Sequence, residues 1–271
     1  MSHHPIEDHD LGLSHDLPRI ARTGVGRRGL LGIAGGLGLT ALTGCGAGDA
    51  GTGAAVPAVE ATSGEIPEET GGPFPGDGSN GPNVLTESGV VRSDLTTSFG
   101  EATGVAAGVP LTIRMRVYDL NGDQAGPLPG AAVYLWHCDR DGNYSMYSAE
   151  AADENYLRGV QEADADGALE FTTIFPACYS GRWPHAHFEV YASLADATSA
   201  SGRLRTSQLA FPEETCAAVY AAAPGYEASV PNLAQVSLDT DMVFADGYSL
   251  QLARMSGSVE QGLVATLNVP V

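Results

Sequence analysis

Two histidines and two tyrosines occur in the sequence in an arrangement that could bind one metal ion. His185 and His187 are two residues apart, so on a β-strand both side chains point to the same face. Tyr179 precedes them in a loop rich in Pro and Gly, and Tyr144 lies upstream in a Gly-Asn-Tyr-Ser stretch. Phenolate oxygen is a hard anionic donor that suits ferric iron, and neutral imidazole can complete the set. Each residue taken alone is as readily explained by packing.

The segments around these residues have the pattern of short strands. Residues 111–118 alternate apolar with polar side chains, as a half-buried strand does. Further strands are expected at residues 131–136, 168–174 and 185–191, and a helix is expected at 212–223. Turns rich in Gly, Asp and Pro separate the strands. The pattern predicts an all-β fold, a β-sandwich with a few short helices and long loops.

The beginning of the sequence is typical of an export signal. Arg27-Arg28 precedes a short, weakly apolar run, as in twin-arginine signals, and Leu-Thr-Gly-Cys at 42–45 resembles the lipobox of bacterial lipoproteins. We therefore predict a signal at residues 1–45, with Cys45 carrying the lipid. A plain cleaved signal is the alternative. A membrane-spanning helix at 30–42 would be too short and too rich in Gly.

The same reading gives the organisation of the chain and its location. Residues 46–64 are mostly Gly, Ala, Thr, Pro and Val, which predicts a flexible tether, and residues 65–271 are expected to form the folded domain. The protein is expected outside the cytoplasm, on the outer face of the cell membrane, and to touch that membrane only through Cys45. Its oligomeric state is not predicted.

The charge of the chain excludes one class of partner. The formal net charge is -20, and all 13 basic residues are arginines. Such an acidic protein repels phosphate backbones, so nucleic acid is not an expected partner. Of the seven histidines, four lie in the first 15 residues, so the expected mature domain keeps only His137, His185 and His187.

Three cysteines remain if Cys45 is lipidated, namely Cys138, Cys178 and Cys216. At most one disulfide can form among them. Two of the three, Cys138 and Cys178, are close in sequence to the candidate metal ligands. A disulfide that braces the site and a set of small buried residues are both consistent with the sequence.

Several longer motifs resemble those of the intradiol ring-cleavage dioxygenases. They are Asn-Tyr-Leu-Arg-Gly and the residues after it at 155–167, Trp-His leading to Gly-Asn-Tyr-Ser at 136–145, Pro-Ala-Cys-Tyr leading to Arg-Trp-Pro-His-Ala-His at 176–187, and Arg-Ser-Asp-Leu at 92–95. Together they cover roughly residues 65–210 in the order that the family has. The resemblance implies the prealbumin-like or immunoglobulin-like sandwich of that family.

The resemblance also implies an activity and the residues that carry it. An aromatic diol of the catechol type would be cleaved by O2 between its two hydroxyl-bearing carbons, giving a muconate-type diacid. Tyr144, Tyr179, His185 and His187 would bind the Fe(3+) cofactor. Tyr179 would also take up a proton from the substrate, and Arg182 would stabilise negative charge that builds on it.

The resemblance also implies residues near the substrate. Gln208 resembles a glutamine that follows the histidine strand in the family and lies close to the substrate. Trp183, Tyr156 and Phe74 are expected to line the pocket. Phe74 departs from the pattern, because an aromatic hydroxyl often stands there. The sequence does not indicate which catechol is the substrate, nor what role the region after Tyr220 has.

A second function of another class is also consistent with the fold. Transthyretin-like and carbohydrate-associated modules have similar sandwiches, so the domain could be an extracellular binding module without turnover. A complete set of four ligands together with Arg182 favours the enzyme, because a binding module has no need to keep them together.

Overall fold

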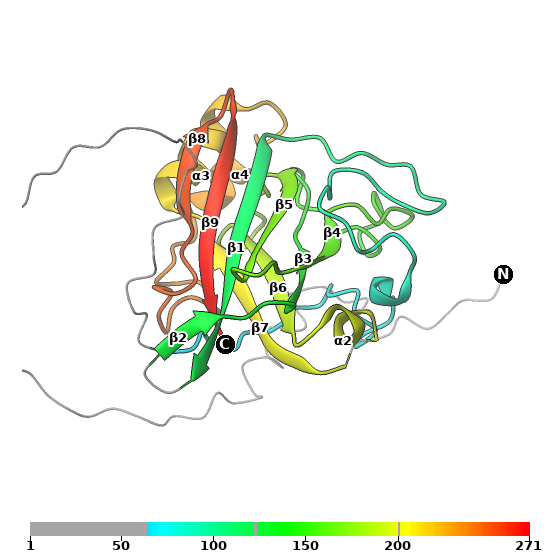
Figure 1. Cartoon of the computed structure of the whole chain (residues 1–271). Helices are drawn as coiled ribbons and strands as arrows, with labels where there is room; N and C mark the ends of the chain where they lie inside the picture. The colour runs from blue at the N-terminus through cyan, green and yellow to red at the C-terminus, as the bar shows by residue number, and fades with distance from the viewer. Residues whose placement is uncertain (1–63, 122–123, 200) are drawn as a thin grey trace, which may run out of the picture. The chain divides into compact units, whose positions relative to one another are not determined.

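The strands form two sheets in the computed structural model, which describes residues 64–121, 124–199 and 201–271 (Figure 1). The first sheet has the order β2-β1-β9-β8, and β5 also pairs with β1; the second has the order β4-β3-β6-β7. The first comprises β1 (Pro110–Asn121), β2 (Gln124–Pro127), β5 (Ala168–Ile174), β8 (Arg254–Ser258) and β9 (Gly262–Pro270). The second comprises β3 (Ala132–Trp136), β4 (Arg158–Glu162), β6 (His185–Tyr191) and β7 (Arg203–Ala210).

The helical elements of the described residues are short. They are η2 (Val84–Thr86), α2 (Leu194–Thr198), α3 (Glu213–Ala222) and α4 (Ser229–Leu233). Pro212 is the N-cap of α3, and two glutamates in the first turn interact favourably with the helix dipole. None of the described helices has the length and apolar character that crossing a bilayer requires.

The main hydrophobic core lies between the two sheets. From β1 it receives Leu111, Ile113, Met115 and Val117, the apolar half of the alternating pattern. Facing residues of the second sheet include Leu135, Phe188 and Val190. Each such side chain contributes about 1.5–3 kcal/mol when it is fully buried, so the alternation determines which face of β1 turns inward.

The other face of the second sheet is buried as well, under loops. All five residues of β3 are buried, including Tyr134 and Trp136, whose rings stack 4.8 Å apart and belong to a second apolar cluster. In the register of β3 and β6, Trp136 lies opposite His187. The predicted metal ligands on β6 therefore belong to this loop-covered face.

Residues 65–80, here called the N-terminal segment, supply part of that cover. Its Glu69 amide donates to the Thr206 carbonyl on β7 (2.8 Å). The Pro75 carbonyl accepts hydrogen bonds from the Tyr134 hydroxyl (2.7 Å) and from Nη1 of the buried Arg158 (3.0 Å). These contacts hold the N-terminal segment across the face that carries His187.

The all-β sandwich predicted from the sequence is confirmed. The strands expected at 168–174 and 185–191 have those bounds, the strand expected at 111–118 lies within the longer β1, and the predicted helix corresponds to α3. Strands β8 and β9 lie in the region after Tyr220. Cys45, the signal at 1–45 and the tether up to residue 63 lie outside the described residues.

Candidate active site

Four donor atoms from the predicted metal ligands converge on the loop-covered face. The Nε2 atoms of His185 and His187 are 3.1 Å apart. The Tyr179 hydroxyl lies 3.2 Å from Nε2 of His185 and 3.4 Å from the Tyr144 hydroxyl. The structure thus brings together all four residues, which the sequence distributes over a strand and two loops.

A backbone contact fixes the orientation of the first imidazole. Nδ1 of His185 lies 2.5 Å from the Trp183 carbonyl oxygen, which can only accept a hydrogen bond. The proton of a neutral imidazole therefore resides on Nδ1, and Nε2 presents its lone pair to the other donors. This is the tautomer that a metal ligand requires.

The second imidazole is held by packing. The ring of His187 stacks on Trp136, with centroids 5.0 Å apart and planes 5° from parallel. Gly72 of the N-terminal segment also lies against this ring and has a φ of +71°; a Cβ built there would lie 3.2 Å from Cε1 of His187. Close approach of backbone to ring is the reason for glycine at this position.

Tyr144 is placed by the tight loop that follows β3. The Asp139 carboxylate accepts hydrogen bonds from the amides of Asp141 (2.9 Å) and Asn143 (2.8 Å), and the Tyr144 amide donates to the Ser148 hydroxyl (2.9 Å). The ring of Tyr144 packs against Phe74, with centroids 5.1 Å apart. Two chain segments therefore determine where its hydroxyl lies.

Burial determines the protonation of the four side chains. It lowers the pKa of His185 and His187 well below the usual value, and the charge of Arg182 adds to this effect. Burial also raises the pKa of Tyr144 well above its usual value and that of Tyr179 to about 12. The imidazoles are neutral and offer lone pairs, whereas the phenols release their protons only if a bound cation compensates.

The spacing and chemistry of these donors fit a single metal ion. Two ligands about 2.1 Å from one ion and at right angles to each other are about 3 Å apart. The observed donor separations of 3.1–3.4 Å are close to that value. Among the described residues, no group of three or more His, Cys, Asp or Glu could hold a metal. The candidate set at this site is two imidazole nitrogens and two phenol oxygens. Two hard oxygens with two imidazoles suit ferric iron.

Arg182 is a buried cation beside the four donors. Its Nη2 donates to Oε1 of Gln208 (2.7 Å), whose amide nitrogen donates to the Thr70 carbonyl (2.8 Å). Its Nε donates to the Asp241 carboxylate (2.9 Å), and the two side chains are 5% and 0% exposed. Burial opposes the charge, but attraction to Tyr179 and Asp241 outweighs burial and raises the pKa of Arg182.

Of the three residues expected to line the pocket, only Phe74 has its side chain packed against a predicted ligand, Tyr144. The indole of Trp183 packs with Val243 and Phe244, and its N–H donates to the Phe211 carbonyl (2.8 Å). Tyr156 belongs to a separate apolar cluster, and its hydroxyl donates to Asp139 (3.3 Å). A substrate contact by Trp183 or Tyr156 stays a prediction.

The remaining histidine of the described residues has a packing role. His137 has Nδ1 2.7 Å from the Cys138 carbonyl and Nε2 2.7 Å from the Thr173 hydroxyl, so both ring nitrogens are engaged. Cys138, Cys178 and Cys216 are free, buried thiols. Of the two possibilities that the sequence left open, the structure has the small buried residues.

Asp241 is a site residue that the sequence did not indicate. It lies in the region after Tyr220, within a run of acidic and polar residues, and the chain has 33 Asp and Glu in all. Its complete burial against Arg182 is a tertiary contact between segments 59 residues apart in the sequence. No local pattern in the sequence distinguishes it from its exposed neighbours.

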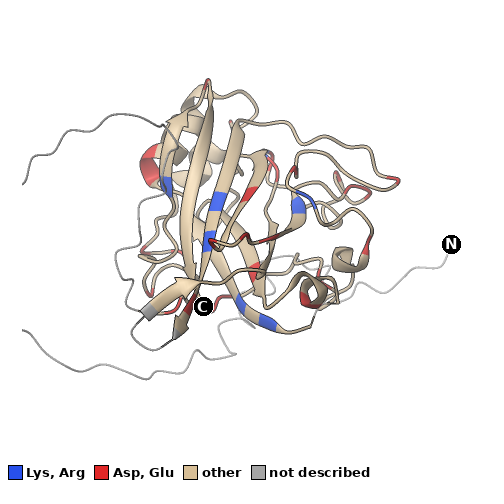
Figure 2. Cartoon of the chain, viewed as in Figure 1, with Lys and Arg blue, Asp and Glu red and all other residues tan. Residues whose placement is uncertain are grey.

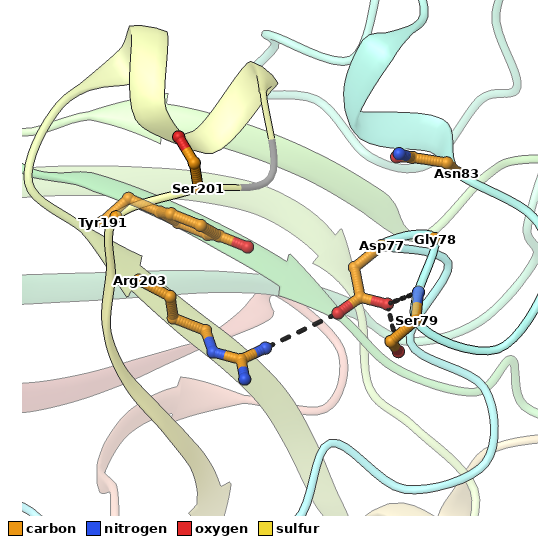
Figure 3. A pocket seen from close by; sticks show the side chains of 8 residues that line it. Asp77, Gly78, Ser79, Asn83, Tyr191, Ser201 and Arg203 are labelled. Atoms are coloured by element: carbon orange, nitrogen blue, oxygen red, sulfur yellow. Dashed lines mark hydrogen bonds and ion pairs between the residues drawn. The ribbon is translucent and has the colours of Figure 1, made fainter.

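A polar pocket of about 560 Å³ lies near the opposite end of β6 (Figure 3). None of the predicted site residues lines it. Across it, Nη1 of Arg203 lies 3.6 Å from the Asp77 carboxylate and 2.7 Å from the buried carboxylate of Glu189. The arginine of this pocket, Arg203, is thus already paired with two carboxylates.

Figure 2 shows acidic residues over the loops and at the start of α3, with arginines on β1, β4 and β7.

Comparison with known proteins gives the class of the chain. A model of the protein family described as "Dioxygenase" matches residues 80–215, about half of the chain. The chain is 35% identical over 92 residues to chlorocatechol 1,2-dioxygenase of Rhodococcus opacus, covering 30% of this chain and 35% of that protein. It is 32% identical over 108 residues to catechol 1,2-dioxygenase 1 of Acinetobacter lwoffii, covering 29% of this chain and 35% of that protein.

The chain therefore belongs to the intradiol ring-cleavage dioxygenase family. Its matches span about a third of the length of these curated relatives. The fold is similar to that of an intradiol ring-cleavage dioxygenase from Tetranychus urticae, with a TM-score of 0.61 at 22% identity, covering 76% of this chain and 94% of that one.

Proposed function

We propose that the protein is a ferric intradiol dioxygenase that cleaves an aromatic diol of the catechol type with O2. The observation that carries this proposal is the convergence of two phenol oxygens and two imidazole nitrogens, each within 3.4 Å of at least one other. Family membership supports the reaction class, and the relatives named above act on catechol and chlorocatechol. Tyr144, Tyr179, His185 and His187 would hold the ion.

The bound ferric ion would supply Lewis acidity toward the two oxygens of the diol and accept electron density from its ring. The side chains of the protein would manage the protons. A catechol must lose two hydroxyl protons to bind through both oxygens; a Tyr179 phenolate could take up one of them, and the other would pass to solvent. A pKa of about 12 in the absence of a cation makes that phenolate a strong base.

Arg182 would act on the charge that develops on the substrate. Its guanidinium is buried and held by Gln208 and Asp241, so it needs no reorganisation when charge appears nearby. In a buried site this preorganised cation interacts more strongly than it would in water. Phe74 and Tyr144 offer aromatic surface at the same place, against which a planar ring could pack.

The test is oxygen uptake by the iron-loaded protein with a panel that includes catechol, chlorocatechols, hydroxyquinol and protocatechuate, with identification of the products. A muconate-type diacid formed with uptake of one O2 per diol is the expected result. Binding of catechols without oxygen uptake would instead support the transthyretin-like binding module. Products cleaved beside the two hydroxyl-bearing carbons, and not between them, would contradict the proposal.

We also propose that the protein is exported and lipid-anchored. Support comes from Arg27-Arg28 and from the Leu-Thr-Gly-Cys sequence that ends at Cys45. In this arrangement residues 46–64 would tether the domain formed by 65–271 to the outer face of the membrane. A route that exports folded proteins would suit a domain whose metal ligands come together only on folding.

A further inference from the structure

Asp241 links two parts of the candidate active site. Its side chain is fully buried, and Oδ2 accepts hydrogen bonds from Nε of Arg182 (2.9 Å) and from the backbone amide of Trp183 (2.7 Å). Oδ1 accepts from the amides of Val243 (2.9 Å) and Phe244 (3.3 Å), which fixes the carboxylate in its own loop. The carboxylate is thus fixed by its own loop, independently of its contacts with Arg182 and Trp183.

The Trp183 peptide carries this contact to a predicted metal ligand. The amide of Trp183 donates to Asp241, and the carbonyl of Trp183 accepts from Nδ1 of His185 (2.5 Å). A hydrogen-bonded partner behind a ligating imidazole fixes its tautomer and orientation. Here the partner of the imidazole is the Trp183 carbonyl, and the Asp241 carboxylate acts on it indirectly, by accepting from the amide of the same residue.

The other partner is the cation of the site. Asp241 engages Nε and Nη2 of Arg182, and Gln208 also engages Nη2, whereas Nη1 has no hydrogen bond to any described residue. A guanidinium fixed along one edge can present the opposite one without swinging. The contacts of Asp241 therefore determine which N–H group of Arg182 remains available.

We propose that Asp241 is a positioning residue that fixes the Arg182 guanidinium and, through the Trp183 peptide, the imidazole of His185. It belongs to the region after α4, beyond the residues matched by the family model. This inference rests on the proposed function for its kinetic consequences. Its consequence for metal binding does not depend on any substrate.

The test compares Asp241→Asn with Glu189→Gln, which neutralises another buried carboxylate that pairs with an arginine, Arg203. Partners of this kind behind a metal ligand are typically worth about 10- to 100-fold in metal affinity or activity. Asp241→Asn should weaken iron binding, measured by competition with a chelator, by about tenfold or more, and should lower kcat more than it raises KM. Glu189→Gln should change the thermal midpoint but neither of these quantities.

A double-variant series separates the two contacts. If Asp241 acts on turnover through Arg182, adding Asp241→Asn to Arg182→Ala should lower kcat by less than about threefold beyond Arg182→Ala alone. Losses in kcat that simply multiply would overturn the Arg182 part of the proposal. Wild-type iron affinity in folded Asp241→Asn would overturn the His185 part.

Two outcomes need a further measurement: a variant that does not fold, and a wild type that consumes no oxygen. If Asp241→Asn does not fold, Asp241→Glu keeps the charge but displaces the carboxylate, and the same loss of iron affinity and kcat is expected in smaller measure; wild-type values would overturn the proposal. If the iron-loaded wild type consumes no oxygen with any diol, the proposed function fails. The chelator competition then still decides whether Asp241 positions His185.

Discussion

The hydroxyl oxygens of Tyr144 and Tyr179 lie 3.4 Å apart, although β4 and β5 separate the two residues in the sequence. Both phenols are buried, which raises the pKa of each. Two phenolates could not lie this close without a cation between or beside them, because their charges repel. As neutral phenols the two can share a hydrogen bond, and the proposed ferric ion would supply the positive charge that they need when they lose their protons.

The first prediction is that the iron-loaded protein is coloured. Ferric iron bound to phenolate absorbs visible light by charge transfer, so a burgundy protein is expected. Tyr144→Phe and Tyr179→Phe should each weaken or shift the band, measured beside iron content. A colourless wild type with one ferric ion per chain would show that the phenols are not ligands.

Tyr179→Phe should also slow turnover. The variant keeps Tyr144, His185 and His187 and should still bind iron, but it lacks the hydroxyl proposed to accept the substrate proton. General-base groups contribute typically 10²–10⁴-fold, so kcat should fall by roughly 100-fold or more. Oxygen consumption per bound iron is the measurement, and unchanged kcat would remove Tyr179 from the proton transfer.

Loss of either histidine on β6 should abolish most metal binding. His185→Ala and His187→Ala each remove one of two imidazoles, and His137 cannot substitute because both its ring nitrogens are engaged. His137→Gln is the matched control and should bind iron, although with lower thermal stability. Full oxygen consumption by either β6 variant would overturn the assignment of the ligands.

Gly72→Ala should weaken metal binding although it replaces none of the predicted ligands. A methyl group at Gly72 would lie 3.2 Å from Cε1 of His187, whereas at Gly100, which has the same φ of +71°, it would meet nothing within 4 Å. Alanine in this left-handed conformation costs roughly 1–2 kcal/mol at either position. Both variants should therefore lose stability in urea, but only Gly72→Ala should lose iron affinity. Equal iron affinity in both would show that the contact with His187 is unimportant.

Stability should depend on pH through Glu69. Burial, and then the charge of Asp246, raise the pKa of Glu69 from 4.5 to about 7. Between these values the folded protein holds a proton that the unfolded chain has released, so this group makes stability fall as pH rises from about 4.5 to about 7. In Glu69→Gln that fall should be smaller, measured as urea midpoints at both ends of the range. An identical pH profile in the variant would contradict the shift.

The anchor can be tested by fractionation. Cys45→Ser should move the protein from the membrane fraction to the soluble one, because the lipid-bearing thiol is lost. Replacing Arg27 and Arg28 by lysine should stop export through the twin-arginine route. If wild type and Cys45→Ser partition alike, Cys45 does not carry the anchor.

Much of the sandwich could be predicted because its strands have a local signal. Residues 185–191 have β-branched and aromatic residues bounded by Pro184 and Ser193, and β5 alternates buried with exposed side chains. Strand β9 has the same alternation, with Leu263, Ala265, Leu267 and Val269 buried, so its pattern was also present in the sequence. Such strands can be predicted because their alternation is visible within a few consecutive residues.

That His185 and His187 lie on one face could be predicted for a related reason, since residues two apart share a face on any strand. The roles of Tyr144 and Tyr179 were implied by the family resemblance and stay predictions. What could not be predicted were contacts between distant segments. The place of Gly72 on the His187 ring and of Asp241 on Arg182 depends on how loops cross the sheet, and no residue pattern within either loop encodes it.

Strand β9 also bears on how the domain can be divided. It lies between β1 and β8, pairing Leu111 with Leu263 in parallel, so the first and last strands of the described chain are adjacent in one sheet (Figure 1). Contacts of such high sequence separation are formed late and cooperatively, after the entropy of a long loop has been lost. Residues 80–215, the part that defines the family, include β1 but lack β9. They are therefore not expected to fold as an autonomous unit, and a fragment with those bounds should expose the apolar edge and face that β9 covers and should aggregate.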